Sequence, residues 1–228
     1  HLRPFKKLLL YFLKKSYLVI IHEPTLKELL NTTELDIIIL HDPLPRLNIK
    51  NNITLEEKKE KYFVYIGTGG SDEPLEPVVS AFKKIKDFTL YITGSWKVKN
   101  IKNIPQNVKF TGFLKQEDFE KLLFNSYAIM AFTEWEYTLL GAAYEALSLG
   151  KPLITSNTRA LKNFFKENCI YVEHNPDSIF EGVKKLTENY SYYKAKWEEF
   201  RKNFLREVER EIEFLRHKIV FKNRRIKK

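Results

Sequence analysis

Three glutamates in the stretch TEWEYTLLGAAYEALSLGKPLIT, residues 133–155, are the side chains best suited to chemistry in this sequence. Glu145 is surrounded by one glycine and three alanines, so little side-chain bulk would keep a ligand away from its carboxylate. Such a carboxylate accepts two hydrogen bonds from a vicinal diol such as a ribose. Glu134 and Glu136 precede the helix that we expect to begin near Thr138, where backbone amides attract anions. A solvated or salt-bridged helix residue is the alternative for Glu145.

A second group of candidates lies in GTGGSDEP, which follows an apolar run and precedes a helical pattern. Gly67, Thr68, Gly69 and Gly70 would let backbone amides approach a phosphate, because glycines carry no side chain and a helix N-terminus favours anions. The loop matches neither the P-loop nor the GxGxxG fingerprint. An ordinary strand-to-helix turn is therefore the alternative.

Two further places offer weaker candidates. Gly94 ends another apolar run, and Lys97 or Lys99 behind it could neutralise a diphosphate, although flexible surface lysines look the same in a sequence. His41 ends an apolar run in LHDPLP, so it is expected either to touch a substrate or to serve structurally beside Asp42.

The elements that would position these residues alternate between short apolar strands and helices. Many strands are apolar on both faces, which predicts an α/β fold with a Rossmann-like parallel sheet and helices on both faces. Ligands bind such sheets at the carboxyl ends of the strands, where the candidate loops lie. Strands are expected at 17–22, 35–42, 62–67, 88–94, 107–113, 127–133, 152–156 and 169–173, and helices at 5–15, 24–31, 76–85, 115–126, 139–150, 158–167, 177–190 and about 191–218.

Length and cysteine content narrow the class of protein. The chain has 228 residues, enough for one large domain with a substantial core. Its single cysteine, Cys169, excludes a disulfide framework and a Cys-based zinc site, and its apolar surroundings favour a buried structural thiol. No apolar run reaches the ~18 residues that span a bilayer.

The net charge of +10 is concentrated in the two ends of the chain. Residues 1–16 carry five basic and no acidic side chains, and residues 201–228 carry eleven basic against four acidic ones. The nearly neutral centre argues against a nucleic-acid groove across it. Basic ends interleaved with apolar residues fit an anionic membrane surface or a polyanionic partner, and solvated charge on terminal helices is the alternative.

The segment YEALSLGKPLITS resembles the C-terminal, nucleotide-sugar-binding domain of GT-B-fold glycosyltransferases of the group 1 or family 4 type. Residues 108–123 resemble the strand, glycine and helix that border the base pocket of that family, so Gly112 and Phe113 would line it. YFVYIGTGGSDEPLEPVVSAFKKI resembles the strand, loop and helix that open the domain. The resemblance covers roughly residues 62–190.

This resemblance implies transfer of a sugar, with retention, from a nucleotide-diphosphate sugar such as a UDP- or GDP-sugar. Glu136 and Glu145 would be the catalytic candidates, with Glu136 facing the donor sugar and Glu145 holding the ribose hydroxyls. The amides of Thr138 and Leu139 would face the phosphates. No metal is expected to be required. The implied nucleotide-binding residues are Gly67, Thr68, Gly69, Gly70, Gly94, Lys97, Gly112, Phe113, Thr138, Leu139 and Glu145.

Two departures from the family pattern stand out. The family separates its two glutamates by seven residues, whereas eight lie between Glu136 and Glu145, and Tyr137 stands where the first glutamate would be. The loop after residues 62–67 also lacks the Arg and Lys that usually grip the diphosphate. Lys97, Lys99 or a group from another domain would have to replace them.

The expected organisation has three parts: 1–50, a shortened N-terminal acceptor-side region with a linker; 51–190, the nucleotide-sugar-binding domain; and 191–228, a basic C-terminal helix and tail. The basic, apolar ends would dock on a membrane bearing a lipid-linked acceptor, or pair with a partner chain or a second copy. The expected location is the cytoplasm, peripheral to the membrane.

Three alternative functions stay open at this stage. One is a non-catalytic nucleotide-sugar-binding or scaffold subunit of a split transferase. Another is a sugar-nucleotide epimerase on the same fold. Nucleic-acid binding through the terminal KNRRIKK is a remote alternative, because these residues lie outside the expected domain core.

Overall fold

The structure is a computed structural model that describes residues 5–30, 35–47, 61–97, 101 and 103–226. Contacts divide the chain into two units, a larger one of Leu44–Arg201 and a smaller one of His1–Pro43 with Lys202–Lys228. The expected domain boundaries after residues 50 and 190 remain predictions. Of the expected features, Lys99 lies outside the described residues.

The larger unit contains one parallel sheet in the order β5-β4-β3-β6-β7-β8. From β3 the chain proceeds outward through β4 to β5, and from β6 it proceeds the other way to β8. The order therefore reverses between β3 and β6, which confirms the predicted Rossmann-like sheet and fixes its switch point. The strands are β3 (Tyr62–Tyr65), β4 (Thr89–Thr93), β5 (Val108–Gly112), β6 (Ala128–Ala131), β7 (Leu153–Ser156) and β8 (Ile170–Val172).

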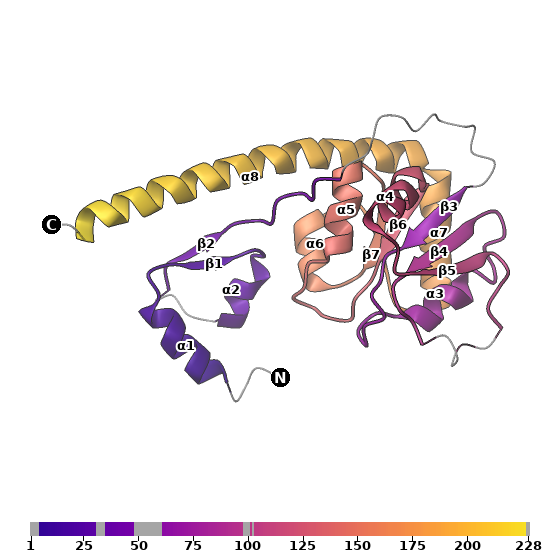
Figure 1. Cartoon of the computed structure of the whole chain (residues 1–228), viewed down its shortest axis with the longest axis horizontal. Coiled ribbons are helices and arrows are strands. Elements are labelled where there is room, and N and C mark those ends of the chain that lie inside the picture. Colours follow the sequence, from indigo (N-terminus) through magenta and orange to yellow (C-terminus); the bar gives the residue numbers. More distant parts are fainter. Residues whose placement is uncertain (1–4, 31–34, 48–60, 98–100, 102, 227–228) are drawn as a thin grey trace. The chain divides into compact units, whose positions relative to one another are not determined.

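Helices cover this sheet on both faces, as predicted (Figure 1). α3 and α7 contact each other, and α4 contacts α5, which packs on β6 and β7. Every residue of β6 and β7 is buried, because both faces of these strands lie under helices. The helices are α3 (Leu75–Ala81), α4 (Gln116–Asn125), α5 (Gly141–Leu149), α6 (Arg159–Phe165), α7 (Pro176–Glu188) and the beginning of α8 (Tyr190–Ile226).

The start of α8 belongs to the core of the larger unit. Trp197 is fully buried, and its indole N–H donates to the carbonyl of Ala146 at 3.2 Å. Its ring lies 5.3 Å from that of Phe165. The helix was expected to end near residue 218, but it continues to Ile226.

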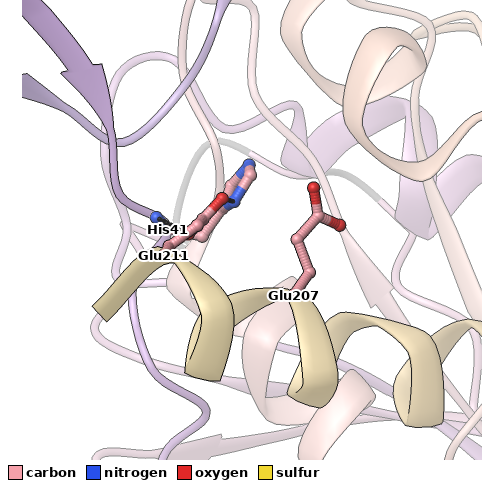
Figure 2. Close-up of side chains that lie close together, drawn as sticks. All are labelled: His41, Glu207 and Glu211. Carbon is pink, nitrogen blue, oxygen red and sulfur yellow. Dashed lines mark hydrogen bonds and ion pairs between the residues drawn. The ribbon is translucent and has the colours of Figure 1, made fainter. Parts of the chain in front are cut away.

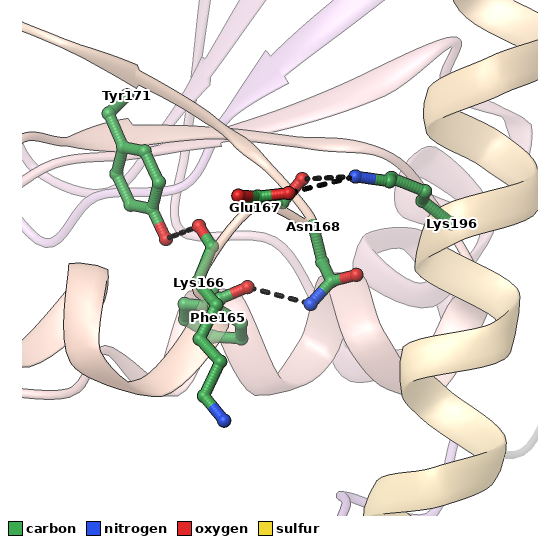
Figure 3. Close-up of polar contacts among 6 residues, drawn as sticks. All are labelled: Phe165, Lys166, Glu167, Asn168, Tyr171 and Lys196. Carbon is green, nitrogen blue, oxygen red and sulfur yellow. Dashed lines mark hydrogen bonds and ion pairs between the residues drawn. The ribbon is translucent and has the colours of Figure 1, made fainter.

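A hydrogen-bonded turn joins α6 to β8 at the amino ends of the strands, opposite the edge where the candidate loops lie (Figure 3). Lys166 has a φ of +50°, a conformation that favours glycine. The turn is held by the Tyr171 hydroxyl, which donates to the Lys166 carbonyl at 2.7 Å, and by the Asn168 side chain, which donates to the Phe165 carbonyl at 2.8 Å. Burial raises the pKa of the neighbouring Cys169 thiol to about 12, which fits the predicted structural role.

Within its described residues, the smaller unit holds a two-stranded parallel sheet and three helical segments. β1 pairs with β2 in parallel, so α2 forms the crossover between them. Its elements are α1 (Lys6–Lys15), β1 (Val19–Ile21), α2 (Thr25–Leu30), β2 (Ile37–Ile39) and the part of α8 from Lys202 onward. None of the described helices is long and apolar enough to cross a membrane.

One expected helix boundary was wrong in a way that bears on the site. The helix carrying Glu145 was expected near Thr138, but α5 begins at Gly141. Leu140 is extended, with a φ of −98° and a ψ of 129°, and Thr138 and Leu139 lie outside the helix. Their amides therefore do not form the first turn of α5.

Candidate functional site

The loops after β3 and β6 meet at the switch point of the sheet. The Thr133 hydroxyl donates to the Asp72 carboxylate at 2.6 Å, and the Glu134 amide donates to the Asp72 carbonyl at 2.9 Å. These two bonds join the halves of the sheet where strand order reverses. Parallel sheets of this type bind ligands at that crevice.

The glycine-rich loop forms an anion cradle, defined here as the backbone amides of Thr68, Gly69 and Gly70. The Glu73 carboxylate accepts hydrogen bonds from these amides at 2.9, 2.8 and 3.0 Å, and from the Thr68 hydroxyl at 3.2 Å. Successive amides that point at one place bind anions. In this loop, the Glu73 carboxylate occupies the predicted anion site. Sequence reasoning missed Glu73 because it considered the glycines alone.

Negative charge gathers around this cradle. Tyr65, buried at the end of β3, has a hydroxyl that makes no hydrogen bond with a described residue. Burial raises the pKa of Tyr65 well above its ordinary value, and the charges of Glu73 and Asp72 raise it further. An incoming anion would therefore meet two carboxylates as well as three amides.

The glycines of the loops after β3 and β4 allow the two backbones to touch. Gly94 has a φ of +91°, and a side chain there would place its Cβ 2.1 Å from the Gly67 carbonyl oxygen. Gly69 has the same φ, and its Cβ would lie 2.1 Å from the Ser95 carbonyl oxygen. Both positions therefore require glycine.

A cavity of 230 Å³ opens between the loops after β3, β4 and β5. It brings together five of the predicted site residues, Gly67, Thr68, Gly94, Gly112 and Phe113. The Phe113 side chain is 74% exposed at this cavity, where a planar ring could stack on it. The cavity also involves residues that were not predicted to line a site, namely Ile66, Leu114, Gln116 and Phe119.

Glu145 lies in the middle of α5 and is partly buried, but it does not line the cavity. Desolvation by burial raises the pKa of its carboxyl to about 7. No described residue offers it an ion pair that would offset this cost. A hydroxyl-bearing ligand that donates to the carboxylate would favour the ionised form.

Glu136 is held by the beginning of α6. Its side chain accepts a hydrogen bond from the Arg159 amide at 2.9 Å, and its carbonyl accepts one from the Ala160 amide at 2.9 Å. Glu136, Thr138 and Leu139 do not line the cavity. Like the cradle, this carboxylate is already engaged within the chain.

A side-chain network ties together the ends of β6, β7 and β8. Ser156 accepts a hydrogen bond from the Thr133 amide at 2.8 Å, and its hydroxyl lies 2.8 Å from His174 Nε2. Burial lowers the pKa of His174, while the charges of Glu134 and Glu173 counteract that shift. The sequence analysis missed His174, since only the topology brings it to Ser156.

Lys97 follows the loop after β4 and is exposed, but it is not among the residues that line the cavity. Its role as a substitute for the family's diphosphate-gripping cations therefore remains a prediction.

The sequence was compared with protein-family models and with curated proteins. The family described as "Glycosyl transferases group 1" matches residues 48–204, which cover more than half of the chain. Among curated proteins, no sequence is similar enough to count as a match.

Solved structures show the same fold. A glycosyltransferase from Rickettsia africae ESF-5 has a TM-score of 0.69 and 16% identity, over 89% of this chain and 62% of its own. HepE of Anabaena, in complex with UDP and glucose, has a TM-score of 0.76 and 9% identity, over 96% and 67%. TarM of S. aureus, in a complex that includes UDP, has a TM-score of 0.70 and 18% identity, over 91% and 45%. The chain thus spans about half to two thirds of the length of these relatives.

Proposed function

The chain belongs to the group 1 glycosyl transferases, and on that premise we propose that it binds a nucleotide-diphosphate sugar and transfers the sugar to an acceptor with retention, as a family 4 type enzyme. The observation that carries this proposal is the 230 Å³ cavity beside the anion cradle, at the carboxyl ends of β3, β4 and β5. An exposed aromatic ring, a cavity and adjoining amides suit a base followed by a diphosphate.

Each part of the donor has a candidate partner. The base would occupy the cavity and stack on Phe113, and the ribose hydroxyls would donate to Glu145. Glu136 would face the sugar once the donor is bound. UDP is the favoured diphosphate, because HepE and TarM bind UDP and share this fold.

The cradle supplies the donors that the departing diphosphate needs. When the bond between the sugar and the diphosphate breaks, negative charge develops on the leaving oxygen, and fixed amides stabilise such charge. The amides of Thr68, Gly69 and Gly70 can serve only after the Glu73 carboxylate leaves them. Displacement of Glu73 is therefore part of the proposed binding event.

The acceptor side of the proposal rests on α1. This helix has no buried described residue, and it exposes Leu8, Leu9 and Phe12 beside Lys7, Lys14 and Lys15. Apolar and basic side chains on one short helix suit an anionic lipid surface. We therefore place the protein at the cytoplasmic face of a membrane, with a lipid-linked acceptor. Sedimentation with anionic and with neutral vesicles tests this placement, and equal recovery in both pellets would contradict it.

Calorimetric titration with UDP, GDP, ADP and TDP tests donor binding. UDP should bind with micromolar affinity, and Glu145→Ala should weaken it at least tenfold, because a hydrogen bond to a charged group is worth ~1.5–3 kcal/mol. Glu181→Ala, an exposed glutamate on α7, is the matched control and should bind normally. Absence of binding by all four diphosphates would overturn the proposal.

One observation favours a second function, a non-catalytic nucleotide-sugar-binding or scaffold subunit. Glu73 fills the cradle in a loop that lacks the family's Arg and Lys. Release of sugar or diphosphate from a labelled donor separates the two functions, because the subunit would bind the donor without turning it over.

A further inference from the structure

Three side chains that commonly bind metals lie together in the smaller unit, and none belongs to the loops described above (Figure 2). His41 follows β2, whereas Glu207 and Glu211 are one turn apart on α8 and so share one side of that helix. One ligand atom from each residue lies within 4.8 Å of the others. Figure 2 shows the Glu207 carboxylate and the His41 ring on the same side of α8.

His41 is held in place before any cation arrives. Its Nδ1 lies 2.7 Å from one carboxylate oxygen of Glu211, and its backbone amide donates to the other oxygen at 2.9 Å. The ring also packs edge-on against Phe204, with centroids 5.8 Å apart. The Glu211 carboxylate on α8 is thus an acidic partner of His41, which is compatible with the structural role expected for this histidine.

The negative charge of its two glutamates favours binding of a cation at this cluster. Glu207 and Glu211 bring two carboxylates close together, and among the residues that the structure describes none forms an ion pair with Glu207. A divalent cation would neutralise both.

We propose that His41, Glu207 and Glu211 bind one divalent transition-metal cation, with Zn²⁺ as the best fit. An imidazole nitrogen combined with carboxylate oxygens suits zinc, whereas Mg²⁺ and Ca²⁺ prefer oxygen ligands alone. Three protein ligands leave a coordination position for water. The site is separate from sugar transfer, for which no metal is expected to be required.

The cation would connect two stretches that lie far apart in the sequence. His41 comes from the N-terminal part of the smaller unit, and both glutamates come from its C-terminal helix. The unfolded chain cannot present these ligands together, so binding would stabilise the folded unit. The Asp36–Lys218 ion pair joins the same two stretches and marks the same junction.

The test is a calorimetric Zn²⁺ titration of the full chain after EDTA treatment and dialysis. The native protein should bind one Zn²⁺ per chain at this site, and Glu207→Gln should weaken that binding at least tenfold. Glu207 is exposed, so the substitution should leave the fold intact, which circular dichroism checks. Glu209→Gln is the matched control, because it removes the same charge from an exposed residue on another side of α8.

A second readout uses Co²⁺ in place of Zn²⁺. Visible absorption bands of a bound Co²⁺ should appear in the native chain and in Glu209→Gln, and they should be lost in Glu207→Gln. Equal metal affinity in all three chains would show that other histidines or the surface hold the ion, and would overturn the proposal. Absence of saturable binding to the native chain would overturn it as well.

Discussion

The two halves of the large sheet present different chemistry at their carboxyl ends. Beyond β3, β4 and β5 the loops offer backbone groups, because glycines bring the chains together and the cradle consists of backbone amides, which the Glu73 carboxylate occupies. Beyond β6, β7 and β8 side chains make the contacts, because the Ser156 hydroxyl accepts a hydrogen bond from the Thr133 amide and lies 2.8 Å from His174 Nε2. The first half depends on glycines that have no side chain, and the second depends on the hydrogen bonds that its side chains make. Substitutions should therefore damage the two halves for different reasons.

We call the loops after β3, β4 and β5 the glycine half. The largest effect is expected from Gly94→Ala in this half. The new Cβ would lie 2.1 Å from the Gly67 carbonyl oxygen at a φ of +91°, so the loops after β3 and β4 would have to separate. We expect a loss of about 4 kcal/mol in the free energy of unfolding, measured with urea, together with loss of UDP binding.

Gly141→Ala is the control for this prediction. Nothing lies within 4 Å of a Cβ at this position, which is the first residue of α5. The variant should be as stable as the native protein or gain up to ~1 kcal/mol. Similar losses in both variants would contradict the view that close backbone approach makes the glycine half sensitive.

Glu145 gives the next largest effect, which depends on pH. Its pKa is about 7 in the folded protein, above the ordinary value of 4.5, so the folded state keeps a proton that the unfolded chain has released. The free energy of unfolding should therefore fall as pH rises from about 4.5 to 7, by roughly 3 kcal/mol, and stay low above that range.

Glu145→Gln should remove this pH dependence, which urea unfolding at pH 5 and pH 8 would reveal. Glu181→Gln, on α7, should leave the dependence as in the native protein. If the Glu145 variant keeps the native slope, another group causes it and the carboxyl of Glu145 titrates normally.

Ser156→Ala tests the side-chain half, that is, the ends of β6, β7 and β8 and the loops that follow them. It removes the acceptor of the buried Thr133 amide and the partner of His174, so we expect a loss of about 2 kcal/mol in the free energy of unfolding. Ser95→Ala in the glycine half alters an exposed hydroxyl and should cost under ~0.5 kcal/mol. Equal costs would erase the contrast between the halves.

Glu73→Gln carries the smallest expected effect, and it acts on ligand binding. A neutral amide accepts weaker hydrogen bonds than a carboxylate, so an external anion should compete better for the cradle. UDP should bind about tenfold more tightly, or ~1.4 kcal/mol, in calorimetry. Glu76→Gln, exposed in the first turn of α3, is the control. Unchanged affinity in the Glu73 variant would show that the diphosphate does not use the cradle.

The sequence predicted more of the residues that meet in the glycine half than of those that meet in the side-chain half. Gly67, Thr68, Gly94, Gly112 and Phe113 all line one cavity, because each ends or follows a strand and parallel strands end at one edge. These positions can be read from local patterns of apolar runs and glycines.

The side-chain contacts could not be read in this way. The bond between Ser156 and His174 depends on which strands are neighbours, and that order is a property of the whole sheet. The start of α5 was also misplaced, because Leu140 is apolar and fits a helical pattern although its backbone is extended. Glu73 was overlooked because its partners are amides, which every residue carries.

The internal bond between Glu73 and the cradle has a consequence for the rate of donor binding. If an external anion must wait for the carboxylate to swing away, the observed association rate should level off at high donor concentration, at the rate of that opening. A direct encounter would instead give a rate that rises linearly. Stopped-flow measurements on the native protein and on Glu73→Gln would thus show whether the departure of the Glu73 carboxylate limits the rate at which a donor binds.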